Sequence, residues 1–177
     1  MVTVEDIKSL RETTGFGVME CKRALAESKG DLNAARLMLK EKGLVKVADR
    51  GARLAKEGLV ETYIHNAGRM GVMVEINCET DFVALNAEFQ SFAHNIAMHI
   101  AAAAPVFVTE EEIPEDLLSG LPQDEQDDFR KEKILLNQEY IKDVSMTVGE
   151  MLTDLIAKTG ENIVIRRFAR FALGQEA

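Results

Sequence analysis

The sequence predicts an α+β fold, in which a small helical module precedes a core made of sheet and helices. Residues 58–78 alternate apolar and polar side chains around a short turn, which is the pattern of a β-hairpin. Residues 89–104 repeat apolar side chains at helical spacing, and residues 162–173 form a third apolar strand pattern. Together these patterns predict a three-stranded antiparallel sheet packed with helices.

Length and charge limit the classes of protein that fit. A chain of 177 residues makes one domain, or one domain with a small appendage, and 46% hydrophobic residues suffice for an ordinary core. The net charge of −9 argues against general nucleic-acid binding, which needs a basic surface, and favours partners with basic patches. Apolar runs fall short of a membrane span.

The termini and cysteines favour a cytoplasmic protein. Glu5 and Asp6 stand where a signal or transit peptide would need basic residues. Cys21 and Cys78 are far apart and lack metal-ligand spacing, so we expect two buried free thiols in a reducing compartment.

The first forty residues predict a bundle of short helices. Thr3 is a candidate N-cap with Asp6 as its charged partner, Gly30 ends the second helix, and Asp31 caps the third. Such a bundle is marginal on its own because it buries little surface. The expected helices span residues 4–13, 18–28 and 32–41.

The Gly15-Phe16-Gly17 turn between the first two helices does not indicate a nucleotide site. A dinucleotide-binding loop needs a third glycine and a preceding strand, whereas position 20 is Glu and a helix precedes. The glycines instead allow a tight turn, which leaves Phe16, Val18 and Met19 near its tip.

A basic stretch, residues 40–56, follows the bundle and is interrupted by glycines. One interpretation is a solvated linker helix, and the other is a contact strip for an acidic or phosphate-bearing partner. We therefore divide the chain into a helical module of residues 1–42, a linker of residues 43–57, and a core of residues 58–177.

The connection between the second strand and the long helix is the candidate binding element. The strands are expected at residues 58–65 and 70–78 and the helix at 86–104. Asp81 and Phe82 lie on the connection, where an acid beside an exposed aromatic side chain suits an interface anchor. The alternative is that Thr80 or Asp81 caps the next helix and Phe82 belongs to the core.

The C-terminal half predicts an acidic, turn-rich segment at residues 109–128, helices at 123–137 and 146–157, and the last strand. This strand is apolar on both sides, with Ile163 and Ile165 expected on one face and Val164 and Phe168 on the other. A sheet with two apolar faces must pack against other protein elements on both faces. We expect a homodimer to cover the second face, and the alternative is that residues 109–157 fold over it.

Catalytic chemistry is not predicted. The sequence lacks a phosphate-binding loop, a nucleophile elbow and a zinc-binding helix motif. The acids next to Cys78 would raise its pKa, which opposes a reactive thiolate. His65, His94 and His99 are not spaced as metal ligands. We expect neither an enzyme nor a cofactor or metal site.

Several stretches resemble one family. Residues 10–25, beginning Leu-Arg-Glu-Thr-Thr-Gly-Phe-Gly-Val-Met, resemble the N-terminal motif of translation elongation factor Ts, and Thr80-Asp81-Phe82-Val83 resembles its central motif. Residues 138–149 and 159–167 are similar to further family stretches, in the same order. Long members carry a duplicated core and an extra helical hairpin, whereas residues after Gly58 leave room for one core, so the chain resembles a short, single-core form.

The resemblance implies a function, partner and binding residues. It implies a ubiquitin-associated-like N-terminal module and a guanine-nucleotide exchange factor that promotes GDP release from elongation factor Tu in the bacterial cytoplasm, giving a 2:2 complex if the chain dimerises. It implies that the Asp-Phe pair enters the GTPase near its magnesium ion and that the N-terminal module grips the base side. The partner-binding residues carried over are Thr80, Asp81, Phe82, Val83, Val18 and Met19, with Arg11 or Lys8 as polar support.

Two other functions remain open from the sequence. The chain could be a helical adaptor whose N-terminal module binds an unrelated protein, or an RNA-associated protein that uses the 40–56 strip. The acidic net charge opposes the second of these.

Overall fold

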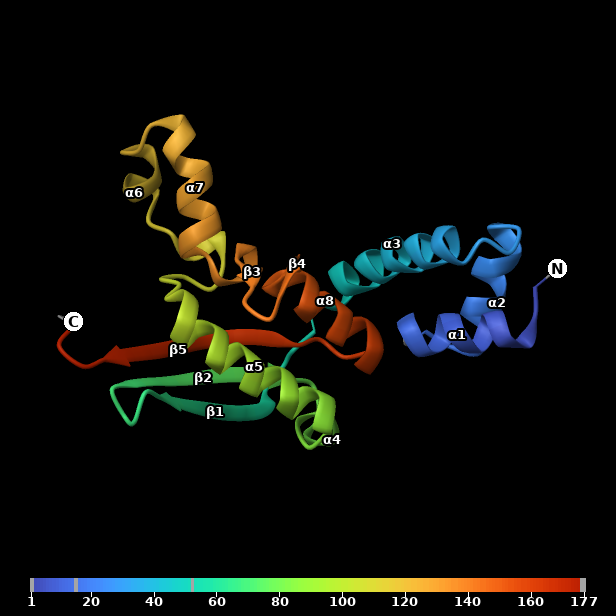
Figure 1. Ribbon diagram of the computed structural model, residues 1–177, viewed down its shortest axis with the longest axis horizontal. Coiled ribbons are helices and arrows are strands. Elements are labelled where there is room, and N and C mark those ends of the chain that lie inside the picture. The colour runs from blue at the N-terminus through green and yellow to red at the C-terminus, as the bar shows by residue number, and fades with distance from the viewer. Residues whose placement is uncertain (1, 15, 52, 176–177) are drawn as a thin grey trace. The chain divides into compact units, whose positions relative to one another are not determined.

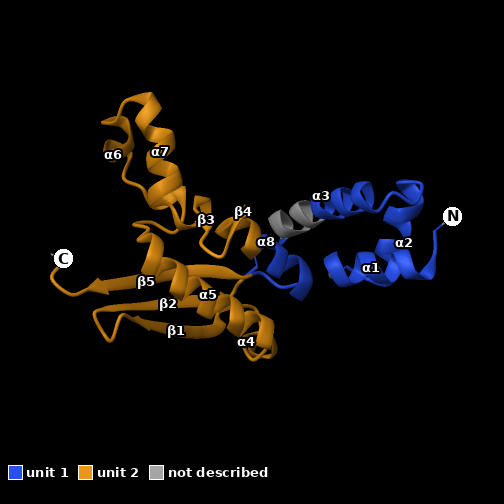
Figure 2. Ribbon diagram, viewed as in Figure 1, with its two compact units in different colours: residues 1–53, 153–162 blue, residues 54–152, 163–177 orange. Residues whose placement is uncertain are grey.

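The computed structural model describes residues 2–14, 16–51 and 53–175, and for residues 43–49 it describes the backbone but not the side chains. The chain forms two compact units (Figure 2). Unit 1 comprises residues 1–53 with 153–162, and unit 2 comprises residues 54–152 with 163–177.

Unit 1 contains the three N-terminal helices, α1 (Val4–Thr14), α2 (Val18–Glu27) and α3 (Leu32–Arg50). Thr3 and Asp6 form the expected capping box: each backbone N–H donates to the other's side chain, at 3.0 and 3.1 Å. The third helix runs to Arg50 rather than to residue 41, because a single glycine costs a helix only about 1 kcal/mol. The buried cluster of this unit consists of Leu10, Phe16, Cys21, Ala24, Leu25, Ala35 and Leu39.

Unit 2 contains the predicted sheet, which confirms the α+β fold class (Figure 1). Strands β1 (Glu57–His65), β2 (Met70–Cys78) and β5 (Val164–Ala172) lie in the order β1-β2-β5, with both pairs antiparallel. The β1–β2 hairpin turns through residues 66–69, as expected.

Helix α5 (Ala87–Ala103) covers one face of this sheet (Figure 1). Alternate residues of β2 point toward it and are buried, which is the period-two pattern of a half-covered strand. On the helix, Phe89, Ile96 and Ile100 are fully buried. The buried residues of β2 are Val72, Val74, Ile76 and Cys78.

A bulge in β5 changes the sheet face to which residues of this strand point. The register shifts between Glu75 and Ile76, so that Val164 pairs with Asn77 while Phe168 pairs with Val74. Asn77 and Val74 point to opposite faces, so the prediction that Val164 and Phe168 share a face is wrong. Strict alternation could not reveal this, since one extra residue inverts every later side chain.

The other sheet face, which we call the open face, keeps apolar side chains exposed. It carries an ion pair in which Arg167 Nε donates to Glu75 Oε2 at 2.7 Å. Around this pair lie Val60 (58% exposed), Ile64 (66%), Met73 (54%) and Phe171 (73%).

The segment between α5 and β5 differs most from expectation. The single helix predicted at residues 123–137 is α7 (Gln123–Lys133) followed by a 3-10 turn at Leu135–Asn137. Two short elements, a 3-10 turn (Glu110–Glu112) and α6 (Glu115–Ser119), precede it. The small hairpin of β3 (Glu139–Tyr140) and β4 (Asp143–Thr147) was not predicted, because its strands are too short to show a period.

The predicted helix near residue 150 is α8 (Val148–Thr159). Thr147 caps it: Glu150 N–H donates to Thr147 Oγ1 at 3.1 Å, and Thr147 N–H donates to Glu150 Oε2 at 3.0 Å. Within the described ranges, none of the helices combines the length and apolarity required to span a membrane.

Candidate partner-binding site

The connection after β2 folds as a one-turn helix, α4 (Asp81–Ala84), rather than as an irregular loop. Thr80 is its N-cap and accepts a hydrogen bond from Val83 N–H at 3.4 Å. The Cys78 thiol donates to Thr80 O at 3.1 Å, which ties the cap to the end of the strand. Helix α4 packs against β1 and β2, so its backbone is held on a rigid support.

Phe82 is exposed on this support. The residue is 82% exposed, whereas Val83 is half-buried and Ala84 buried. The Asp81 side chain is exposed and has no hydrogen-bond or ion-pair partner among the described residues. The alternative prediction that Phe82 belongs to the core is therefore wrong. The accompanying prediction that Thr80 or Asp81 caps a helix is correct, because Thr80 is the N-cap of α4.

Sequence reasoning missed Leu85, which is 73% exposed. Its backbone continues the turn of α4: its φ and ψ are −85° and −7°, and its N–H donates to Asp81 O at 3.0 Å. The next residue, Asn86, caps α5 by accepting from Glu88 N–H at 2.7 Å. A signal existed in the sequence, since Phe82 and Leu85 are three residues apart and three-residue spacing makes neighbours on a helix.

The N-terminal candidates lie on α1 and α2 in unit 1. Val18 and Met19 begin α2 and are 53% and 73% exposed. Lys8 and Arg11 are exposed on α1, and Lys8 lies 3.9 Å from Glu12, an exposed pair that contributes little. Unit 1 holds these four residues, whereas unit 2 holds Thr80–Val83.

Phe16, expected near the tip with Val18 and Met19, is instead buried at 9% exposure. It packs in the helical cluster of unit 1, where its carbonyl accepts from the Cys21 thiol at 3.6 Å. The tip therefore consists of Val18 and Met19 without the aromatic ring.

The basic stretch from Lys40 to Lys56 is partly used within the fold. Arg50 Nη1 donates to Ile156 O at 2.9 Å, and Lys42 lies 3.7 Å from Glu27. The side chains of Lys46 and Asp49, which also belong to the proposed strip, lie outside the described residues. These contacts favour a structural role for at least part of the stretch.

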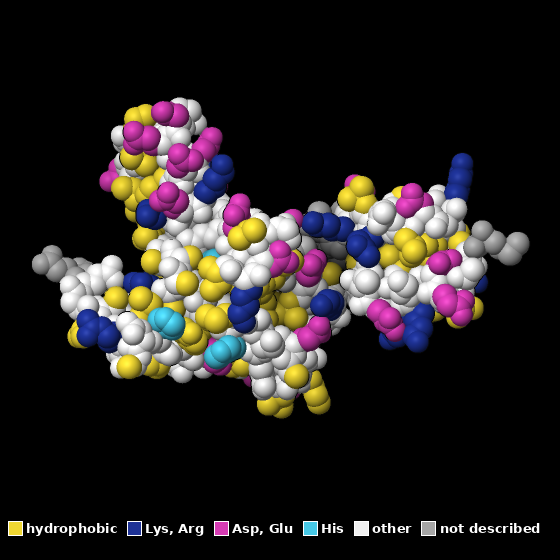
Figure 3. All heavy atoms as spheres, in the orientation of Figure 1, with side chains coloured by type: hydrophobic (Ala, Val, Ile, Leu, Met, Phe, Trp, Pro, Cys, Tyr) yellow, Lys and Arg dark blue, Asp and Glu magenta, His cyan; other side chains and the backbone are white. Residues whose placement is uncertain are grey.

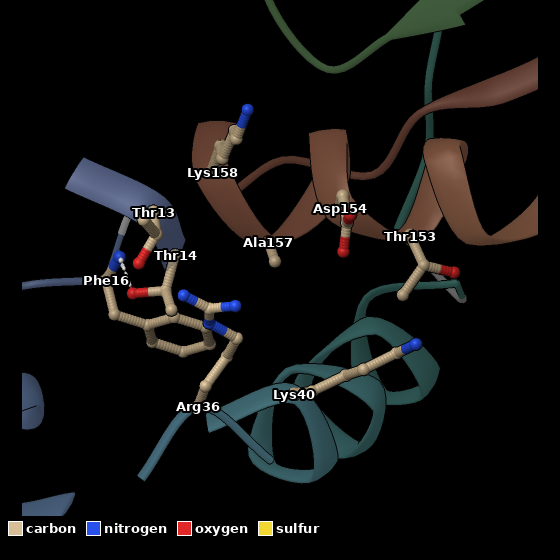
Figure 4. A pocket seen from close by; sticks show the side chains of 9 residues that line it. All are labelled: Thr13, Thr14, Phe16, Arg36, Lys40, Thr153, Asp154, Ala157 and Lys158. Atoms are coloured by element: carbon tan, nitrogen blue, oxygen red, sulfur yellow. Dashed lines mark hydrogen bonds between the residues drawn. The ribbon is translucent and has the colours of Figure 1, made fainter. Parts of the chain in front are cut away.

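A pocket in unit 1 is lined by residues from α1, α3 and α8 (Figure 4). The Arg36 guanidinium points toward Thr14 and Ala157, whereas the Lys40 side chain runs along α3 and the Lys158 side chain points away from the other labelled residues (Figure 4). Its volume of about 200 Å³ is below the roughly 300–1,000 Å³ of typical small-molecule sites. The Thr14 hydroxyl donates to Leu10 O at 2.6 Å, so it is engaged within the fold.

The buried titratable groups are structural. Burial lowers the pKa of His99, whose Nδ1 accepts from Ile141 N–H at 3.3 Å while Nε2 lies 2.9 Å from Gln138 Oε1. Burial also raises the pKa of the Cys21 thiol, which opposes thiolate chemistry. In the part of the chain that the structure describes, no three His, Cys, Asp or Glu side chains gather as metal ligands.

Comparison with known proteins adds the family context. Residues 39–126 match a family model described as "Elongation factor TS". In an alignment 196 positions long, the chain is 47% identical to "Elongation factor Ts" of Caldanaerobacter subterraneus subsp. tengcongensis, and the alignment covers 99% of this chain and 98% of that protein. It is 47% identical to the protein of that name from Carboxydothermus hydrogenoformans, covering 99% of this chain and 90% of the other. With the Moorella thermoacetica protein, it shares 42% identity over 99% and 97% of the two chains.

Proposed function

This chain belongs to the elongation factor Ts family, a family of translation elongation factors, and on that premise we propose that it binds elongation factor Tu–GDP and promotes release of GDP. The single observation that carries the proposal is the exposed Phe82 on α4, beside the Asp81 carboxylate, which has no partner among the described residues. An aromatic ring held on a rigid support gains contact area in a complex without losing much conformational entropy.

Thermodynamic linkage explains how such a contact expels a nucleotide. A GTPase holds GDP through its phosphate loop, Mg²⁺ and base-binding loops. If the exchange factor binds the nucleotide-free GTPase more tightly than the GDP form, each ligand weakens the other by the same factor. The factor needs no covalent chemistry, so we propose that it acts without being a catalyst in the enzymatic sense. In this proposal Phe82 enters the GTPase near its magnesium ion, with Thr80 and Val83 holding α4 in place.

The N-terminal helices supply a second contact in this proposal. Val18 and Met19 expose apolar side chains at the start of α2, and a methionine packs adaptably against a partner. Lys8 and Arg11 add exposed positive charge on α1. We propose that residues 1–42 form the module that grips the base side of the GTPase.

We also propose that the chain forms a homodimer through the open face. Val60, Ile64, Met73 and Phe171 are all more than half exposed on one sheet face, which a second identical face could bury by two-fold pairing. The Glu75–Arg167 ion pair on this face would then help to fix the register. The competing arrangement is a monomer. Light scattering decides between them: a mass near that of one 19.6 kDa chain at every concentration would refute the dimer.

The experiment that tests the proposed function measures release of a fluorescent GDP analogue from purified elongation factor Tu after mixing with this protein. We expect release to accelerate in proportion to protein concentration and then to saturate. A release rate that stays at its spontaneous value would refute the exchange function and leave the adaptor interpretation in its place.

A further inference from the structure

We propose that Leu85 is a second apolar anchor for the GTPase, so that α4 presents a pair of side chains, Phe82 and Leu85, rather than a single aromatic ring. This inference rests on the proposed exchange function, since it names a further specificity-determining residue of the same site. Figure 3 shows hydrophobic side chains protruding from the α4 end of unit 2. Phe82 and Leu85 are the two large apolar residues exposed there, at 82% and 73%.

The geometry of the turn places the two side chains together. Leu85 keeps helical backbone angles, and its N–H donates to Asp81 O at 3.0 Å, so the α4 turn includes it. Residues three apart on a helix have Cβ atoms about 5–6 Å apart and lie on the same side. Phe82 and Leu85 are therefore neighbours, and one apolar pocket of a partner can take both.

The backbone at Leu85 is held by helix caps that precede and follow it in the chain. The Thr80 cap holds the start of α4, and Asn86 caps α5 directly after Leu85, with Asn86 N–H donating to Val83 O at 3.0 Å. A side chain on a backbone held in this way needs little further ordering on binding, which favours its use as an anchor.

Leu85 contributes little to the core, since it is 73% exposed. It stands between the buried Ala84 and the capping residue Asn86. Single exposed apolar residues are ordinary on protein surfaces, but here the leucine adjoins an exposed phenylalanine and a carboxylate without a partner in the described structure. The surface that fits this group is an apolar pocket wide enough for both side chains, with a cation or N–H donor facing Asp81.

The test compares Leu85→Ser with Leu173→Ser in fluorescent GDP release from elongation factor Tu. Leu173 is 72% exposed and follows β5 beside Arg69, at the opposite end of the sheet from α4, so it matches Leu85 in residue type and exposure. For Leu85→Ser we expect the half-saturating concentration to rise about tenfold, equivalent to about 1.4 kcal/mol, with the maximal rate nearly unchanged. Leu173→Ser should behave as wild type, and Leu85→Met, which keeps an apolar side chain, should retain most of the affinity.

The outcomes separate this inference from the proposed function. If the wild-type protein fails to accelerate GDP release, the exchange function itself is wrong. If the wild type is active and Leu85→Ser has the same half-saturating concentration, the second anchor is wrong and the function stands. If Leu85→Ser instead changes the oligomeric state in light scattering, Leu85 serves contact between copies of the chain, which also overturns the inference.

Discussion

Replacing Phe82 with alanine tests the exchange site most directly. The ring is 82% exposed in the free protein, so of a phenylalanine area of about 200 Å², roughly 160 Å² remains to be buried in a complex. At about 25 cal/mol per Å² this area corresponds to a ceiling of ~4 kcal/mol. The alanine Cβ retains part of the contact and ordering costs reduce the rest, so we expect a loss of about 2 kcal/mol, typical of an interface hot spot.

A loss of that size corresponds to about a 30-fold slower release of GDP at subsaturating concentrations of the variant. Stability should change much less, because only about a fifth of the ring is buried within the chain, equivalent to at most ~1 kcal/mol. Stopped-flow release of a fluorescent GDP analogue gives the first quantity and urea unfolding gives the second.

Leu173→Ala is the control, since Leu173 is 72% exposed, lies beside Arg69 at the other end of the sheet and is not among the four residues assigned to the dimer interface. It should leave the release rate per chain unchanged. Phe82 would instead be a residue that stabilises the fold if Phe82→Ala unfolded at a much lower urea concentration while GDP release per folded molecule stayed at the wild-type rate.

Three further predictions concern the rest of the chain. Deleting residues 1–42 should leave a folded core that binds elongation factor Tu weakly; loss of the core's circular dichroism spectrum would contradict the domain boundary, and unchanged affinity would contradict the role of Val18 and Met19. Met73→Glu, which places a charge on the open face, should convert the dimer to monomers in light scattering, and an unchanged mass would place the interface elsewhere. Because burial lowers the pKa of His99 below its ordinary value of 6.5, the unfolded chain takes up the proton more readily, so stability should be full above that value and fall as the pH drops below it. Urea midpoints at about pH 7.5 and about pH 5.5 measure this slope, and an equal slope in His99→Gln would assign the pH dependence to other groups.

The sequence by itself determined the local elements and the fold class. The Thr3–Asp6 capping box, the hairpin of β1 and β2, and the period of α5 are set by neighbours in the chain, so pattern and propensity suffice to predict them. The resemblance to a family also came from linear motifs, and the similarity along 99% of the chain confirms the family.

Only the tertiary structure decided which side chains are exposed. Phe82 and Phe16 both adjoin turns, yet Phe82 is 82% exposed and Phe16 is 9% exposed, because the helices of unit 1 close around Phe16 whereas α4 turns Phe82 away from the sheet. The bulge in β5 likewise depends on pairing with β2, a contact between residues about ninety positions apart that no local pattern encodes. The exposure of Leu85, and with it the proposed second anchor, follows from the same cause: burial is a property of distant contacts, and sequence periodicity reports only on near ones.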